Sequence, residues 1–106
     1  MLYKIASFLL LTVFFNTALA QNKPLLSFNA GGDFKIVQVT DTHVDIPGNK
    51  NMDVFDIVRC IIVEERPDLV VLTGDVVTQD DPIQAYQLFE DLFAEFSMPW
   101  VVAFGN

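Results

Sequence analysis

The chain has 106 residues, of which six are basic and fourteen are acidic, and its formal net charge is −8 at pH 7. This length accommodates one small domain at most. The acidic balance argues against a nucleic-acid backbone as partner, because counterion release requires clustered lysine and arginine side chains. A phosphate-bearing substrate is still possible if metal ions supply the positive charge.

The first twenty residues have the three parts of a secretory signal peptide. Lys4 is followed by the apolar stretch "IASFLLLTVFF" and then by the tripeptide Ala18-Leu19-Ala20. The uninterrupted apolar core is too short for a membrane span, which needs about 20 apolar residues, so no stable anchor is expected. We predict cleavage near Ala20 and export to the periplasm or the exterior. The mature chain would carry five basic and fourteen acidic residues, a net charge of −9.

After an irregular lead-in over residues 21–33, the sequence predicts alternating strands and helices. The stretch "FKIVQVT" (34–40) is rich in β-branched residues, which is typical of a strand buried on both faces. Apolar residues then recur at helical spacing in "NMDVFDIVRCIIVEER" (51–66). We expect Asn51 to be the N-cap of this helix and Pro67 to end it.

The second half of the chain repeats this alternation. The stretch "DLVVLT" (68–73) predicts a second buried strand, and "DDPIQAYQLFEDLFAEF" (80–96) predicts a second helix. Asp81 is the expected cap, and neither Asp80 nor Asp81 is given a catalytic role. "WVVAF" (100–104) predicts a third strand. Strand, helix, strand, helix, strand indicates an α/β fold with parallel strands and right-handed crossovers.

Each predicted strand is followed at once by polar residues and glycines. These segments are Asp41-Thr42-His43, Gly74-Asp75 and Gly105-Asn106. The carboxyl ends of parallel strands share one edge of the sheet, where open α/β sheets bind ligands. The sequence therefore predicts that Asp41, His43, Asp75 and Asn106 lie together at that edge.

Two carboxylates, an imidazole and an amide carbonyl suit a divalent ion such as manganese, iron or zinc. Asp41 and His43 are two residues apart, so in an extended chain they would point the same way and hold one ion. A central Asp75 can bridge two ions, and two ions can clamp a phosphoryl group and make a water nucleophilic near neutral pH. Gly74 and Gly105 remove a Cβ where the backbone must turn and approach closely.

Taken singly, each of these residues is more often structural than functional. An aspartate at a strand end usually caps a helix or forms a turn, and Gly-Asp and Gly-Asn are common turn dipeptides. Their recurrence after three consecutive strands is what indicates a site. The role of Asp45 is left undecided, with a solvated loop carboxylate as the default. Cys60 is the only cysteine, so it forms no internal disulfide and is expected to be a small buried apolar residue.

The motifs "DTH", "GDVV" and "GN", each behind an apolar strand, resemble the first three motifs of the calcineurin-like metallophosphoesterases. The resemblance covers residues 34–106 and implies hydrolysis of phosphate esters by a metal-activated water. It also implies a binuclear site in a two-sheet α/β sandwich, with this βαβαβ unit as its N-terminal part. On this likeness Asp41 and His43 hold the first metal ion, Asp75 bridges both ions and Asn106 holds the second.

The chain also departs from the family pattern. In the family the asparagine is followed by histidine or aspartate and further histidines come later, whereas this chain ends at Asn106 and His43 is its only histidine. The chain is therefore interpreted as the N-terminal fragment of a longer enzyme. Purple acid phosphatases are similar too, but they typically have a tyrosine three residues after the bridging aspartate, where this chain has Thr78.

The fragment by itself is expected to be inactive and poorly folded. Two right-handed crossovers place both helices on the same face of the sheet, so the other face stays open to water or aggregation. The four ligand residues are also too few to hold and tune two metal ions.

An alternative function is a non-catalytic, acidic α/β domain that binds Mg²⁺ or Ca²⁺ at its strand ends, as receiver-like folds do. His43 argues against this alternative, because cages for hard cations use oxygen ligands. The secretion signal also argues against it, since receivers work in the cytoplasm. The sequence leaves open whether the substrate is a monoester, diester, nucleotide or pyrophosphate, and it leaves the oligomeric state open.

The signal-peptide hypothesis predicts the N-terminus of the exported protein. N-terminal sequencing should begin at Gln21, because the small residues Ala18 and Ala20 form the cleavage site. Recovery of intact Met1 in a membrane fraction would contradict it.

Overall fold

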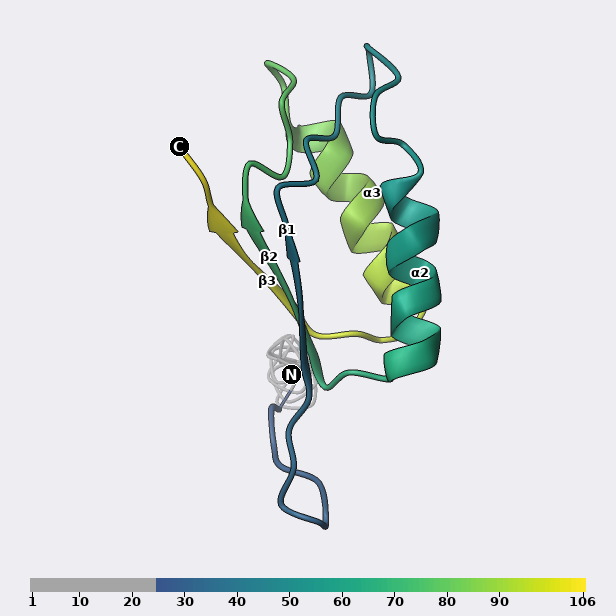
Figure 1. Cartoon of the computed structure of the whole chain (residues 1–106), viewed down its shortest axis with the longest axis vertical. Coiled ribbons are helices and arrows are strands. Elements are labelled where there is room, and N and C mark those ends of the chain that lie inside the picture. The colour runs from purple at the N-terminus through teal and green to yellow at the C-terminus, as the bar shows by residue number, and fades with distance from the viewer. Residues whose placement is uncertain (1–24) are drawn as a thin grey trace, which may run out of the picture.

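The computed structural model describes residues 25–106, so the predicted signal peptide over residues 1–20 lies outside the described residues. The elements are β1 (Ile36–Thr40), α2 (Val54–Glu65), β2 (Leu69–Gly74), α3 (Ile83–Ala94) and β3 (Trp100–Phe104). The three strands form one parallel sheet in the order β1-β2-β3 (Figure 1). The predicted α/β class and its βαβαβ order are confirmed. Between residues 25 and 106, neither helix is long and apolar enough to cross a membrane.

The central strand provides the middle of the core. Val70 and Leu72 of β2 have no exposed surface. Their partners in the parallel register are Val37 and Val39 on β1 and Trp100 and Val102 on β3. Because side chains alternate along a strand, these two rows point to the same face of the sheet.

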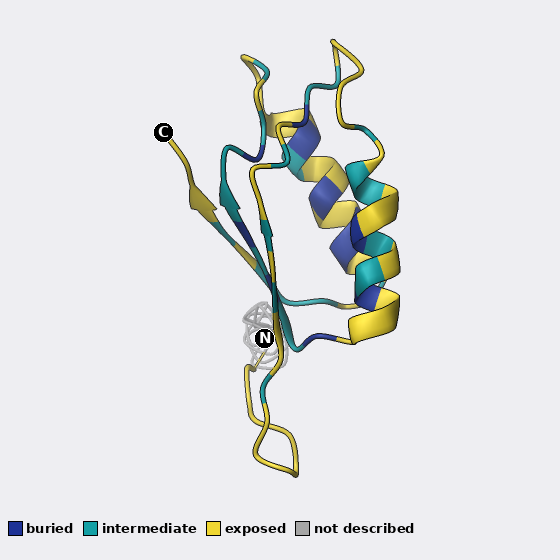
Figure 2. Cartoon of the chain, viewed as in Figure 1, coloured by how far each residue is buried: buried dark blue, intermediate teal, exposed yellow. Residues whose placement is uncertain are grey.

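Both helices pack on that face (Figure 1). Figure 2 shows the buried residues on β2 and on the sides of the helices that face the sheet. The buried residues are Val58 and Ile62 on α2 and Ala85, Phe89, Leu92 and Phe93 on α3. The ring centroids of Phe55 and Phe89 are 4.7 Å apart, and those of Phe93 and Trp100 are 5.3 Å apart. Aromatic contacts therefore join α2 to α3 and α3 to the sheet.

The opposite face of the sheet is uncovered within residues 25–106. Ile36 of β1 is 54% exposed and Val101 of β3 is 49% exposed. This outcome agrees with the expectation that two right-handed crossovers cover one face only. The prediction that the first strand is buried on both faces is therefore wrong for the described part of the chain, because no described helix lies over that side of β1.

Asn51 does not cap α2, which corrects the prediction. The helix begins at Val54 with Asp53 as the N-cap residue, and no side-chain hydrogen bond closes this end. The side-chain amide of Asn51 instead donates a hydrogen bond to the carbonyl of His43 at 3.0 Å. A tertiary contact has replaced the local capping interaction.

Two further predictions on helix residues had different outcomes. Asp81 precedes the N-cap residue of α3, which is Pro82, but its Oδ1 atom accepts a hydrogen bond from the N–H of Ile83 at 3.1 Å. Cys60 is exposed rather than buried. Val58 faces the core. Positions i and i+2 of an α-helix are about 200° apart around its axis, so Cys60 faces away from the core.

Phe89 is the test residue for the core, because it has no exposed surface and its ring stacks with Phe93. We predict that Phe89→Ala lowers the free energy of unfolding by about 3–5 kcal/mol, which is enough to unfold a domain of this size. Urea unfolding gives the free energy of unfolding, and it is followed by the near-UV circular dichroism of Trp100, which packs on Phe93. Val63→Ala, on the exposed side of α2, is the control and should change the free energy by about 0.5 kcal/mol or less. Equal losses in both variants would contradict this description of the core.

Candidate metal centre

The segments that follow β1 and β2 remain paired beyond the regular strands. The N–H of Asp41 donates to the carbonyl of Thr73 at 3.0 Å, and the N–H of His43 donates to the carbonyl of Asp75 at 3.0 Å. These bonds hold the two loops side by side beyond the last ladder pair, Thr40 and Thr73, although the loops are not strands. Main-chain hydrogen bonds therefore place Asp41 and His43 beside Asp75.

Two buried valines anchor these loops in the core. Val44 has no exposed surface and Val76 is 1% exposed, and the N–H of Val44 donates to the carbonyl of Val76 at 2.9 Å. The hydroxyl of Thr42 donates to the same carbonyl at 2.7 Å. Thr42 and Val44 thus turn inward, while the alternate residues Asp41 and His43 remain exposed.

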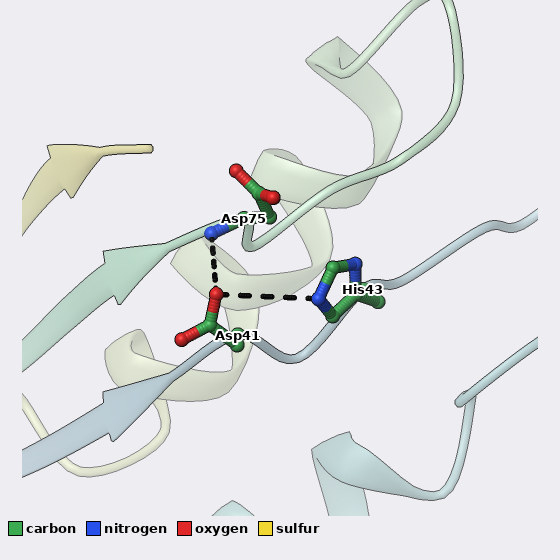
Figure 3. Close-up of side chains that lie close together, drawn as sticks. All are labelled: Asp41, His43 and Asp75. Atoms are coloured by element: carbon green, nitrogen blue, oxygen red, sulfur yellow. Dashed lines mark hydrogen bonds and ion pairs between the residues drawn. The ribbon is translucent and has the colours of Figure 1, made fainter. Parts of the chain in front are cut away.

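Asp41, His43 and Asp75 form one group of side chains, as Figure 3 shows. Each offers one ligand atom, and the three atoms lie within 4.8 Å of one another. Nε2 of His43 is 4.0 Å from Oδ1 of Asp41, and the two side chains are 46% and 55% exposed. Two carboxylates and an imidazole are a donor set that suits a divalent transition metal. The exposure means that an ion can reach these atoms from solvent.

The backbone at Asp41 and His43 is not extended, contrary to the sequence-based argument. Their φ angles are 51° and 48°, in the left-handed region that non-glycine residues seldom adopt. Their side chains approach each other because both residues take this conformation, and not through strand alternation. Strained backbone of this kind persists where the surrounding structure enforces it, and it is concentrated at functional sites.

Hydrogen bonds keep Asp41 ionised. The hydroxyl of Thr40 donates to Oδ2 of Asp41 at 2.6 Å, and the N–H of Asp75 donates to Oδ1 at 3.2 Å. These two bonds, with a smaller contribution from His43, hold the pKa of Asp41 below its ordinary value. The stabilisation from a lowered carboxylate pKa is present above the unfolded-state pKa and is lost as the pH falls through the folded-state pKa. The Asp41 carboxylate is therefore charged at neutral pH.

Two glycines allow the strand ends to approach closely, as the sequence indicated. A Cβ at Gly74, whose φ is +71°, would lie 2.6 Å from Oδ1 of Asp41. A Cβ at Gly105 would contact Oδ1 of Asp75 and would lie 2.8 Å from its backbone nitrogen. The N–H of Gly105 donates to the carbonyl of Gly74 at 2.9 Å. Any side chain at either position would displace an aspartate of the group.

Asn106 follows β3 and lies on the Asp75 side of the group. Together with Asp75 and Gly105 it lines a hollow of about 220 Å³ at the ends of β2 and β3. Tyr86 and Phe104 form another part of the lining, and their ring centroids are 5.9 Å apart. Asn106 and Asp75 thus line the same hollow, whereas Asp41 and His43 do not.

Other polar residues near the group have structural contacts. The Asp45 carboxylate accepts a hydrogen bond from the N–H of Gly48 at 3.0 Å, so it closes its own loop. Asn51 and Thr78 both contact the carbonyl of His43, at 3.0 and 3.4 Å. The sequence did not indicate these two contacts, because the partners are eight and 35 residues apart and no local pattern marks them.

Comparisons with known proteins identify the family of this chain. The family model for calcineurin-like phosphoesterases matches residues 34–106. The chain is 30% identical to "Probable inactive purple acid phosphatase 29" of Arabidopsis thaliana, over 93% of the chain and 32% of that protein. It is 33% identical to "Probable glycerophosphodiester phosphodiesterase GpdQ" of Arcobacter nitrofigilis, over 67% of the chain and 29% of that protein.

A third relative is "Uncharacterized metallophosphoesterase YkuE" of Bacillus subtilis, which is 32% identical over 69% of the chain and 26% of its own length. The chain spans about a third or less of the length of these curated relatives. No solved structure matches it.

The close approach at Gly74 can be tested against a second glycine. Gly32 also has a positive φ, +84°, but a Cβ there would meet nothing within 4 Å. Gly32→Ala and Gly74→Ala each incur a left-handed backbone cost of about 1–2 kcal/mol. Only Gly74→Ala also drives a methyl group into Asp41, so it should lower the free energy of unfolding by about 1–3 kcal/mol more. Urea unfolding followed by circular dichroism measures the difference, and equal effects would argue against the contact.

Proposed function

This chain belongs to the calcineurin-like phosphoesterase family, and on that premise we propose that it contributes the metal site of a metal-dependent phosphoesterase. The reaction is hydrolysis of a phosphate ester by a water molecule at a binuclear divalent metal site. The observation that carries the proposal is the convergence of Asp41, His43 and Asp75, whose ligand atoms lie within 4.8 Å of one another.

Each ligand residue has a proposed role. Asp41 and His43 hold one ion, Asp75 bridges to a second ion, and Asn106 holds the second, with manganese, iron or zinc as the candidate metals. The position of Asp75 supports a bridging role, because it adjoins Asp41 on one side and lines the hollow with Asn106 on the other. The Nε2 atom of His43 lies towards Asp41, so this nitrogen is the ligand atom that the geometry offers.

The charge balance of the described residues also favours metal ions at this site. When bound, divalent ions supply positive charge for the phosphoryl group and a lowered pKa for the attacking water. Residues 25–106 contain four basic residues, which are Lys35, Lys50, Arg59 and Arg66, and the structure shows ion pairs for two of them. Lys35 pairs with Glu65 at 3.2 Å, and Arg59 pairs with Glu95 at 2.9 Å. These cations are engaged away from Asp75.

A second candidate function is divalent-cation binding without catalysis. The name of the Arabidopsis relative includes the word "inactive", which supports this second function. The same ligand group serves both functions, since binding an ion requires the donor atoms but no acid, base or substrate pocket. Metal binding without turnover by the full-length protein would favour this second function.

Asp75→Asn tests the proposed site in the full-length protein. Loss of a bridging carboxylate should reduce the content of both ions and lower hydrolysis of p-nitrophenyl phosphate or its diester by more than about 100-fold. Asn106→Ala should mainly weaken the binding of one ion. Metal analysis and initial rates with added Mn²⁺ or Zn²⁺ are the measurements.

Glu90→Gln is the control, because Glu90 is an exposed carboxylate on α3 that lies outside the ligand group and does not line the hollow. It should leave metal content and rate unchanged. Two ions retained in Asp75→Asn would reject the bridging role.

A further inference from the structure

The main-chain carbonyl of His43 is held by side chains from two different segments. The Nδ2 atom of Asn51 donates to it at 3.0 Å, and the hydroxyl of Thr78 lies 3.4 Å from it. Asn51 stands just before α2, whereas Thr78 follows β2. Neither residue belongs to the ligand group, yet both act on the peptide that carries the imidazole.

We propose that Asn51 is a positioning residue that fixes the His43 peptide and thereby keeps the imidazole beside Asp41. This inference rests on the proposed metal-dependent function only for its effect on ion binding. The hydrogen bond from Asn51 to His43 is independent of any metal.

The contact matters because His43 has a φ of 48°, a conformation that needs enforcement by its surroundings. The N–H of His43 is already fixed, since it donates to the carbonyl of Asp75 at 3.0 Å. That bond orients the peptide on the N-terminal side of the residue. On the C-terminal side, the N–H of Val44 donates to the carbonyl of Val76 at 2.9 Å, and the hydrogen bond from Asn51 holds the carbonyl of the same peptide at 3.0 Å.

Asn51 is itself well placed to act as a fixed donor. Its φ is 55°, and asparagine is among the residues that best tolerate the left-handed region. Its carbonyl accepts a hydrogen bond from the N–H of Val54 at 3.2 Å, at the start of α2. The preceding loop is closed by reciprocal main-chain bonds between Asp45 and Lys50, at 3.2 and 2.9 Å. The main chain of Asn51 is therefore held by α2 on one side and by the closed loop on the other, which limits the movement of its side-chain amide.

Asn49 provides a matched control in the same loop. It is also an exposed asparagine with a positive φ, 50°. Its main-chain N–H donates to the carbonyl of Ile46 at 3.0 Å, and its side chain is not among the donors to His43. Asn49→Gly and Asn51→Gly each remove a side chain without adding backbone strain, because glycine accepts positive φ freely.

The single histidine of this chain gives a direct readout that needs no metal and no activity. In ¹⁵N-labelled full-length protein made without a polyhistidine tag, the imidazole signals of His43 are identified by their absence from the spectrum of His43→Gln. Asn51→Gly should shift, broaden or split these signals, whereas Asn49→Gly should reproduce the parent spectrum. In calorimetric titrations with Zn²⁺, Asn51→Gly should weaken binding by about 10-fold or more, and Asn49→Gly by less than about twofold.

Asn51→Asp separates the loss of the hydrogen bond to His43 from a general loss of structure. Aspartate keeps the size of the side chain and tolerates positive φ, but its carboxylate has no hydrogen to donate. With far-UV circular dichroism like that of the parent, it should alter the His43 signals as Asn51→Gly does. Unchanged His43 signals in both Asn51 variants would overturn the positioning role. If the parent binds no Zn²⁺, the metal-dependent function fails, while the metal-free spectra still decide the role of Asn51.

Discussion

Main-chain hydrogen bonds between the loops that follow β1 and β2 are the constraint on which the candidate site depends. The bonds from Asp41 to Thr73 and from His43 to Asp75 hold two loops in the register of the sheet. The loops therefore inherit the positional accuracy of the strands, which a ligand group requires. Gly74 permits this pairing, because any Cβ there would occupy the space of the Asp41 carboxylate.

Core packing offsets the strain that this arrangement contains. A non-glycine residue in the left-handed region costs roughly 1–3 kcal/mol, and two residues of the candidate metal centre, Asp41 and His43, adopt it. The inward-facing Val44 and Val76 are almost completely buried directly beside them. Full burial of a valine-sized side chain contributes about 1.5–3 kcal/mol, which is of the same order as the strain. The strained ligands thus alternate with the residues that hold them in place.

The uncovered face of the sheet changes character towards the site. Near the amino ends of the strands it carries apolar residues such as Ile36, which is half exposed. In the middle, Gln38 donates to the hydroxyl of Thr73 at 3.0 Å. At the carboxyl end of β1, Thr40 donates to Asp41. The hydroxyl of Thr40 next to the site therefore stabilises the ionised carboxylate of Asp41. The apolar residues nearer the amino ends of the strands are exposed on this face.

The sequence by itself determined the elements, their order, the parallel sheet and the edge at which polar residues gather. These features follow from local signals: hydrophobic period, helix breakers such as Pro67, and the handedness of crossovers. The tertiary structure alone decided the left-handed backbone at Asp41 and His43 and the use of Asn51 as a donor rather than a cap. These outcomes depend on hydrogen bonds between segments that are distant in the chain. No local sequence pattern encodes such bonds, because the partners are brought together only when the sheet and the loops have formed.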